Sequence, residues 1–123
     1  MRNWLAILMV VGVVTGCVHR RVSDGYQGAV DSTVHIENHH WGDVNIFLIH
    51  DGQRTRLGTV TAASDATFTI PWRIIGSAGQ LQLEAHAIAL PGALDSETMS
   101  YRAGMQINWT LETNLERATL SIY

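Results

Sequence analysis

Apolar and polar residues alternate along most of the chain from Thr33 onward. In the segment TVHIEN, Val34 and Ile36 share one face and His35 and Glu37 the other, which is typical of a half-buried β-strand. The same period of two recurs in later segments that are separated by turn residues. We therefore expect about eight short strands, at 33–38, 44–49, 54–61, 66–71, 80–87, 97–102, 105–112 and 117–123.

The strongest local signal is a hairpin near the middle of the chain. Val44–Ile49 is apolar on nearly both faces, as a central strand requires, and Asp51-Gly52 is suited to a type I′ turn. Arg54–Thr61 then returns as the partner strand. With no helical period after Thr33, the pattern predicts an all-β fold, a small antiparallel Ig-like β-sandwich of 7–9 strands, with a barrel as the alternative.

Alternation also predicts which side chains form the core. Trp109 lies between Ile107 and Leu111 on the apolar face of the segment that alternates most regularly, so we expect it to be buried against Val44–Ile49. Further side chains are expected to point inward from the other strands: Phe68, Ile70, Leu81, Leu83, Ala85, Met105, Ala118, Leu120 and Ile122.

The first residues have a different pattern, that of a targeting segment. Arg2 precedes an apolar run, Trp4–Val14, which is shorter than the roughly 20 residues that span a bilayer and is typical of a secretory signal peptide. The run closes with Val14-Thr15-Gly16-Cys17, which resembles the lipobox of bacterial lipoproteins. An uncleaved N-terminal anchor helix is the alternative.

The resemblance to bacterial lipoproteins implies a covalent lipid. In that family the cysteine, here Cys17, receives a diacylglycerol, the chain is cut before it, and the new amine often gains a further acyl chain such as palmitate. The implied organisation is a signal peptide at 1–16, a lipidated cysteine and tether at 17–32, and a β-sandwich at 33–123. The expected location is the periplasmic side of a membrane or the outer membrane. In this family, a residue such as Val18 after the cysteine mildly favours the outer membrane.

Composition narrows the range of partners. The 8 basic side chains are outnumbered by 11 acidic ones, so the chain lacks the basic stripe that nucleic acid requires. Cys17 is the sole cysteine, so the sequence allows neither an internal disulfide nor a cysteine-ligated metal. We expect no cofactor other than the lipid.

Candidate catalytic and metal-binding residues are sparse. Ser77 lies in IIGSAGQ, which lacks the G-x-S-x-G nucleophile elbow, and we expect no enzyme. His39 and His40 suggest a metal site with His35 or His50, but adjacent histidines on a strand point to opposite faces. A polar loop is the favoured interpretation, and we expect no metal.

Two segments are more apolar than loops usually are, Pro71–Ile75 and Ile88–Leu94. They either bind a protein partner or fold over the ends of the sandwich and close its core. The candidate partner-binding residues are Trp72, Arg73, Ile74, Ile75, Leu90 and Leu94.

These observations favour a non-catalytic lipoprotein that binds another protein, as an accessory or stabilising subunit of a larger membrane complex, for example a photosynthetic or respiratory one. The segment Asn38–Val60 also resembles small uncharacterised bacterial lipoprotein sandwiches, which implies the fold and no activity. The alternative hypothesis is an independent glycan- or peptide-binding surface lipoprotein that uses an exposed Trp41 or Trp72.

Overall fold

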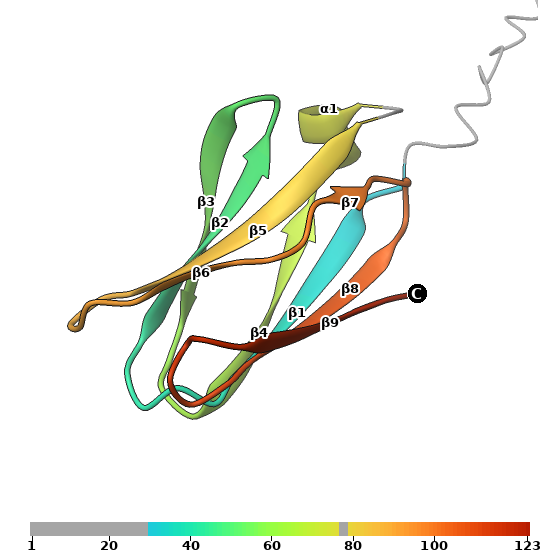
Figure 1. Cartoon of the computed structure of the whole chain (residues 1–123). Coiled ribbons are helices and arrows are strands. Elements are labelled where there is room, and N and C mark those ends of the chain that lie inside the picture. Colours follow the sequence, from blue (N-terminus) through green and yellow to red (C-terminus); the bar gives the residue numbers. More distant parts are fainter. Residues whose placement is uncertain (1–29, 77–78) are drawn as a thin grey trace, which may run out of the picture.

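A computed structural model describes residues 30–76 and 79–123 of the chain. The predicted signal peptide, Cys17, the tether up to residue 29 and Ser77 lie outside the described residues. Two β-sheets pack face to face (Figure 1), which confirms the predicted all-β sandwich. The strands are β1 Ser32–Asn38, β2 Val44–His50, β3 Gln53–Val60, β4 Ser64–Ile70, β5 Gln80–Ala87, β6 Ala93–Asp95, β7 Met99–Ser100, β8 Gln106–Leu111 and β9 Ala118–Ile122.

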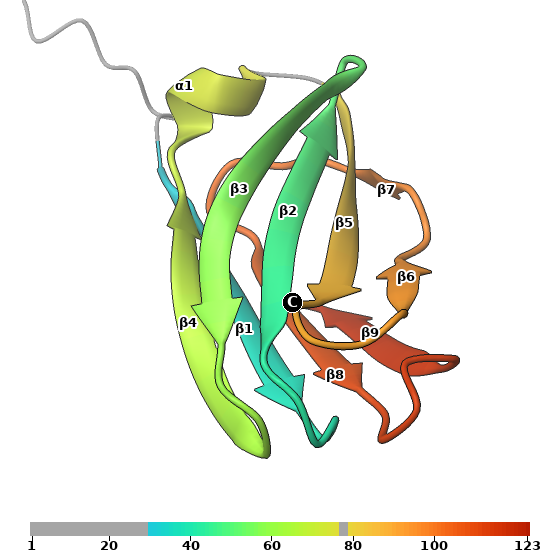
Figure 2. The same ribbon diagram turned by 90° about the vertical axis from the view of Figure 1, so that its left-hand side faces the viewer.

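The first sheet has the order β4-β1-β8-β9, and the second has the order β3-β2-β5-β6 with β7 also paired to β5. Neighbouring strands are antiparallel except β1 and β8, which run parallel, so the sandwich is not antiparallel throughout as predicted. Figure 2 shows β3 and β4 along one long side of the sandwich and β6 and β9 along the other.

The predicted central hairpin is confirmed. Strand β2 lies between β3 and β5, and Asp51 and Gly52 adopt φ angles of 48° and 72°, which a type I′ turn requires at both positions. The register between β2 and β3 shifts between Ile46 and Phe47, so β3 carries one extra residue. Such a bulge bends the strand and increases its twist.

Some strand bounds differ from those expected. Strand β1 begins at Ser32, inside the predicted tether, because the Ser32 side chain is buried and its Oγ lies 3.2 Å from the hydroxyl of Tyr101. The predicted strand at 97–102 is reduced to the two residues of β7. Strand β6 is not among the expected strands, because Ala93 and Leu94 belong to the apolar segment that was predicted to be a loop.

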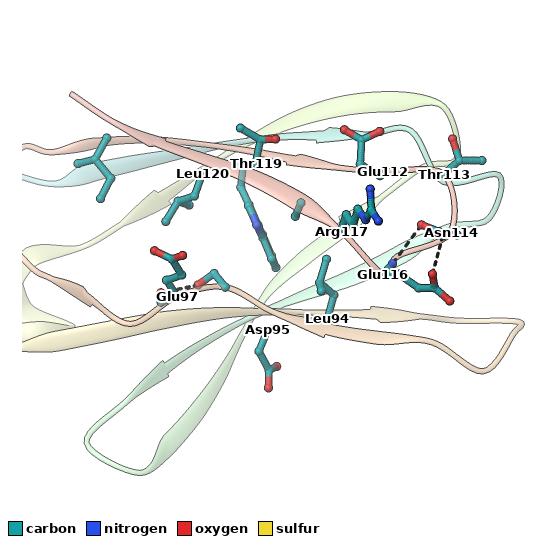
Figure 3. Close-up of a pocket in the computed structure, with 14 residues that line it drawn as sticks. Leu94, Asp95, Glu97, Glu112, Thr113, Asn114, Glu116, Arg117, Thr119 and Leu120 are labelled. Carbon is teal, nitrogen blue, oxygen red and sulfur yellow. Dashed lines mark hydrogen bonds between the residues drawn. The ribbon is translucent and has the colours of Figure 1, made fainter.

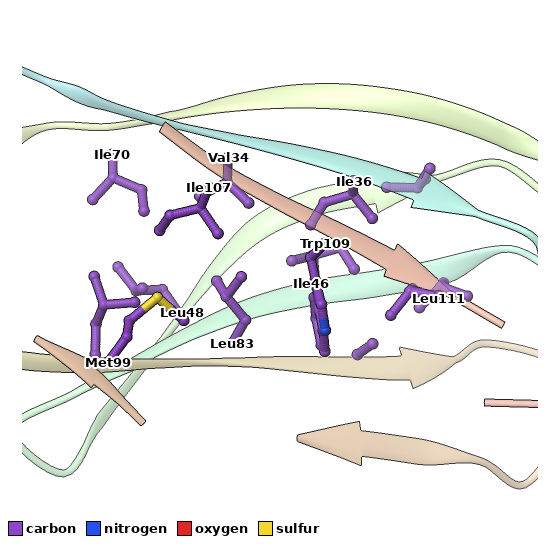
Figure 4. Close-up of a cluster of buried hydrophobic side chains, with 14 of the residues drawn as sticks. Val34, Ile36, Ile46, Leu48, Ile70, Leu83, Met99, Ile107, Trp109 and Leu111 are labelled. Atoms are coloured by element: carbon purple, nitrogen blue, oxygen red, sulfur yellow. The ribbon is translucent and has the colours of Figure 1, made fainter. Parts of the chain in front are cut away.

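The core lies between the two sheets, and Figure 4 shows part of it. Trp109 is only 1% exposed and belongs to the same buried cluster as Ile46 of β2, which confirms its predicted burial. The predictions for β1, β5 and β8 are also confirmed, because the apolar side chains of these strands alternate with exposed or half-buried polar ones. Ile122 lies on the inner face as predicted, since it pairs with Ile107 in the ladder, but it remains 49% exposed.

A single turn of helix, α1 (Trp72–Ile75), follows β4 where Pro71 ends the strand. Gly76 closes it with a φ of 80°, a conformation that favours glycine. No helix in residues 30–76 and 79–123 is long and apolar enough to cross a membrane.

Candidate functional site

Two exposed apolar side chains, Trp41 and Ile88, lie at the end of the sandwich where β1 and β5 finish. Trp41 is 66% exposed and Ile88 is 54% exposed, and the N–H of Ile88 donates to the carbonyl of Asp43 at 3.0 Å. Leu90 is half-buried beside the same loop, because a Cβ added to Gly42 would lie 4.0 Å from its Cδ1. We call Trp41, Ile88 and Leu90 the distal patch.

The loop that carries Trp41 is held rigidly. The amide of Asn38 donates to the carbonyls of Gly42 and Val60 at 3.0 and 3.3 Å, and its Oδ1 accepts from the N–H of His40 at 3.0 Å. The buried ring of His40 stacks on the indole of Trp41, with centroids 5.4 Å apart. Trp41 is therefore presented to solvent from a fixed loop, the kind of aromatic anchor that interfaces use.

Helix α1 lies at the opposite end of the molecule, beside the point where residue 30 enters the domain (Figure 1). The N–H of Trp72 donates to Oδ1 of Asp31 at 3.1 Å, which fixes the helix to the start of β1. Arg73 is exposed, Ile74 is partly exposed and Trp72 is half-buried.

The six candidate partner-binding residues therefore occupy three separate places. Trp72, Arg73 and Ile74 lie at the end where the chain enters, Leu90 lies in the distal patch, and Leu94 lies on β6 along one side. The structure does not bring them together. Ile75 is 5% exposed and belongs to the core, and Leu94 packs against the core from its edge, as expected if these segments close the sandwich.

A hollow of about 1160 Å³ opens between β6 and β9. Its apolar lining comes from Leu94, Trp109, Ala118, Leu120 and Ile122. Leu94 of β6 and Leu120 of β9 lie on opposite sides of this hollow (Figure 3). A second hollow of about 490 Å³ shares Glu97, Leu120 and Ile122 with the first and continues along β9. The sequence did not predict this groove, because alternation places Ile122 on the inner face without showing how much of that face the other sheet covers.

The histidines are dispersed in short polar contacts. On the outer face of the first sheet, His35 Nε2 lies 3.8 Å from Glu37 and from Asp65, and His39 Nε2 lies 3.6 Å from Glu37. His50 lies near the β2–β3 turn, with Nδ1 3.1 Å from the carbonyl of Gln80. Within residues 30–76 and 79–123, no group of three or more His, Cys, Asp or Glu side chains is placed to hold a metal ion.

Polar and aromatic side chains cover the outer face of the second sheet. The guanidinium of Arg54 lies 3.6 Å above the centre of the Phe47 ring and donates to Glu84 at 2.8 Å. His86 contacts the same carboxylate and packs edge-on against Phe47. These four side chains contact one another on the outer face of this sheet.

Comparisons with known proteins add little to this description. No protein-family model and no curated protein matches the sequence. Among solved structures, the chain is similar to a protein described as "NMR structure of the protein from Eubacterium rectale", with 13% identity and a TM-score of 0.46. The match covers 81% of this chain and 90% of the other.

Proposed function

We propose that this chain is a membrane-tethered, non-catalytic β-sandwich that binds another protein. In this proposal a lipid on Cys17 holds the domain on the periplasmic side of a membrane, where it acts as an accessory or stabilising subunit of a larger membrane complex. Photosynthetic and respiratory assemblies are examples. The observation that carries the proposal is the distal patch, in which Trp41 and Ile88 are largely exposed.

The position of the distal patch supports this assignment. The described chain enters at Val30, whose carbonyl accepts from the N–H of Gly104 at 3.0 Å, and β1 then runs away from this point toward the loop of Trp41. Seven strand residues at about 3.3 Å each separate the two ends by roughly 20 Å. A tether attached at Val30 would leave the patch facing away from the membrane, where a protein partner can reach it.

A second candidate function is binding of a glycan or peptide without a permanent protein partner. The observation that favours it is the stacked pair of His40 and Trp41, which offers one exposed indole face on a fixed loop. Aromatic faces of this kind form binding platforms for flat apolar surfaces. Trp72 serves this function less well, since it is half-buried.

The proposal is tested on the full chain in its own membranes, extracted in mild detergent. We expect a stoichiometric protein partner to copurify with the wild type and to be lost from Trp41→Ala, while Thr110→Ala on the outer face of β8 keeps it. We expect Cys17→Ser to leave the membrane fraction or to persist as an uncleaved precursor. Copurification without any stoichiometric partner would contradict the proposal. If Trp41→Ala still copurifies with the partner, the partner binds somewhere other than the distal patch.

A further inference from the structure

The strand at the open side of the sandwich, β9, has a free edge. It pairs with β8 alone, and its other side faces the hollow between β6 and β9. In the antiparallel ladder, Tyr123 and Gln106 exchange both of their backbone hydrogen bonds, at 2.9 and 3.1 Å. Because bonded and non-bonded pairs alternate, the N–H and C=O groups of Ala118, Leu120 and Ile122 point toward the free edge. In the described residues, no other strand pairs with them.

The other edges of the two sheets carry the devices that usually prevent strand addition. Strand β3 bears Arg54 and Arg56, β4 bears Asp65 and is followed by Pro71, and β6 is only three residues long. Strand β9 has the sequence ATLSI, with no charge, proline or glycine. This edge is the one that is suited to pairing.

Strand β9 is complementary to a second copy of itself. A two-fold axis through Leu120 would pair Leu120 with its counterpart and Ala118 with Ile122 of the second copy, through the backbone groups that point outward. The side chains of these three residues line the hollow, so apolar groups would meet on the inner face. On the outer face, the hydroxyl groups of Thr119 and Ser121 would lie opposite each other, which is a favourable cross-strand pair.

The strand itself selects this register. Registers shifted toward the β8–β9 turn would set Glu116 opposite β9 of the second copy, but the N–H of Glu116 already donates to Oδ1 of Asn114 at 3.2 Å. Leu115 has a φ of 56°, so the chain leaves the path of the strand there. A shift in the other direction leaves Ala118 with no residue of β9 opposite it. Only the register centred on Leu120 pairs all of β9.

The charged side chains around the groove also fit a second copy. At one end of β9 the second hollow is lined by Glu97 and Arg102, and at the other end the first hollow is lined by Glu116 and Arg117. Each end therefore has one carboxylate and one guanidinium. The two-fold axis brings these unlike ends together, so that Glu97 would meet Arg117 and Arg102 would meet Glu116 of the second copy. A segment with charges of one sign only would meet a like charge at both ends.

Two further carboxylates do not alter this balance. Asp95 is turned away from the hollow in Figure 3. Glu112 lies with Thr119 on the outer face of the first sheet in the same view, and it pairs with Arg117 in the ladder. Neither carboxylate points into the groove between the sheets.

We propose that two copies of this chain form a symmetric dimer by antiparallel pairing of their β9 strands, which joins the two first sheets into one continuous sheet. Ile122, which is 49% exposed in the single chain, is then covered by Ala118 of the second copy. A strand of five residues makes a small interface, so we expect a weak dimer. This surface is separate from the distal patch, and the inference does not rest on the lipid or on a protein partner.

The dimer is compatible with a lipid tether. Because the paired strands are antiparallel, the two copies of Val30 lie at opposite ends of the dimer. Residues 17–29 reach about 40 Å when fully extended, which is about twice the length of β1. Both lipids can therefore reach one membrane when the strands lie along its surface, and a distal patch stays exposed at each end.

The test of the register uses the full chain in mild detergent, with cysteines introduced on the outer face of β9. Thr119→Cys and Ser121→Cys, given tags of different size and mixed, should form a disulfide-linked heterodimer under mild oxidation, because opposite residues of a non-bonded pair have Cα atoms about 4.5 Å apart. Neither variant alone should crosslink comparably, since equivalent residues are offset by two positions, roughly 7 Å along the strand. The parent chain, which has Cys17, is the blank.

Two outcomes of this crosslinking experiment would overturn the proposal. One is crosslinking of each variant alone as strongly as of the mixture, which would mean unspecific collision or another register. The other is a mixture that crosslinks no more than the parent chain at about 1 mM protein.

Matched charge variants test the same pairing without cysteine. Thr119→Lys/Ser121→Lys sets like charges opposite each other across the two-fold axis and should raise the Kd of the dimer at least about tenfold, measured by sedimentation. Thr119→Lys/Ser121→Glu sets opposite charges there and should retain the dimer. Equal dimerisation of the two double variants, with unchanged thermal midpoints, would contradict the proposal.

Amide hydrogen exchange distinguishes the other occupants of the edge. Exchange at residues 118, 120 and 122 should slow as the protein concentration rises, with little change at 119 and 121, which β8 already protects. Equal protection at every concentration would assign the edge to a segment of the same chain. Protection that appears only when a membrane extract is added would assign it to a different protein. Either result would overturn the proposal and leave the distal patch, which is tested by copurification, unaffected.

Discussion

The two long sides of the sandwich differ in how completely side chains close them. On the side of β3 and β4, the ring of Phe68 covers the backbone so closely that a Cβ added to Gly58 would lie 2.5 Å from its Cε1. On the side of β6 and β9, the sheets leave a hollow of about 1160 Å³, and Ile122 is 49% exposed. One side of the core is sealed by an aromatic ring, and the other is open.

Strand length explains the difference. The edge strands β3 and β4 have 8 and 7 residues and are joined by a short turn, so the two sheets have edges of similar length on this side. Strand β6 has 3 residues, which span only about 10 Å, and it covers part of the 5-residue β9. A small sandwich can therefore keep a complete core while leaving one edge available for a partner.

The largest effect is expected from the residue beneath the open side. Trp109→Ala removes a side chain that is 1% exposed and should lower the free energy of unfolding by about 3 to 5 kcal/mol. The free energy of unfolding of a typical domain is roughly 5 to 15 kcal/mol, so this loss is a large part of it. With one cysteine, the chain has no internal disulfide that could add stability. Thermal or urea unfolding measures the loss, and Thr110→Ala should be nearly silent. An unchanged midpoint for Trp109→Ala would show that the open side contributes nothing to the core.

A smaller effect is expected from overpacking the closed side. Gly58→Ala places a Cβ within 2.5 Å of the Phe68 ring, which must move, and should cost about 1 to 3 kcal/mol. Gly92→Ala is the control, since its nearest neighbour would be Leu115 Cδ1 at 3.5 Å. The double variant Gly58→Ala/Phe68→Leu should recover part of the loss, because the two sites are in contact. Equal stability of Gly58→Ala and Gly92→Ala would mean that this side is not sealed by Phe68.

The elements predicted well from the sequence are those whose alternation is enforced by burial on one face. Strands β1, β2, β5 and β8 lie in the middle of their sheets, so an apolar residue at every second position has a covering sheet opposite it. Strand β9 alternates in the same way, but an alternating pattern does not show how far the opposite sheet extends. The groove could not be predicted from the sequence for this reason.

The distal patch was only partly visible in the sequence. The segment Ile88–Leu94 was singled out for its apolar character, and Trp41 was considered only as a platform for glycan or peptide. Their proximity depends on the pairing of β2 with β5, which places the N–H of Ile88 against the carbonyl of Asp43. A pairing between strands more than thirty residues apart is not encoded in local periodicity.

The smallest loss of stability is expected at one of two isoleucines that pair with each other in the same ladder. Ile107 of β8 and Ile122 of β9 are register partners on the inner face, yet Ile107 is fully buried and Ile122 is half-exposed. Ile107→Ala should cost about 2 to 5 kcal/mol, because it leaves a cavity that the core cannot fill. Ile122→Ala leaves no closed cavity and loses only partial burial, so it should cost about 1 kcal/mol or less. Urea unfolding of the two variants measures both losses. Equal losses would show that the open side is covered in solution, and a strand from elsewhere in the chain or from a second copy would then have to occupy the groove.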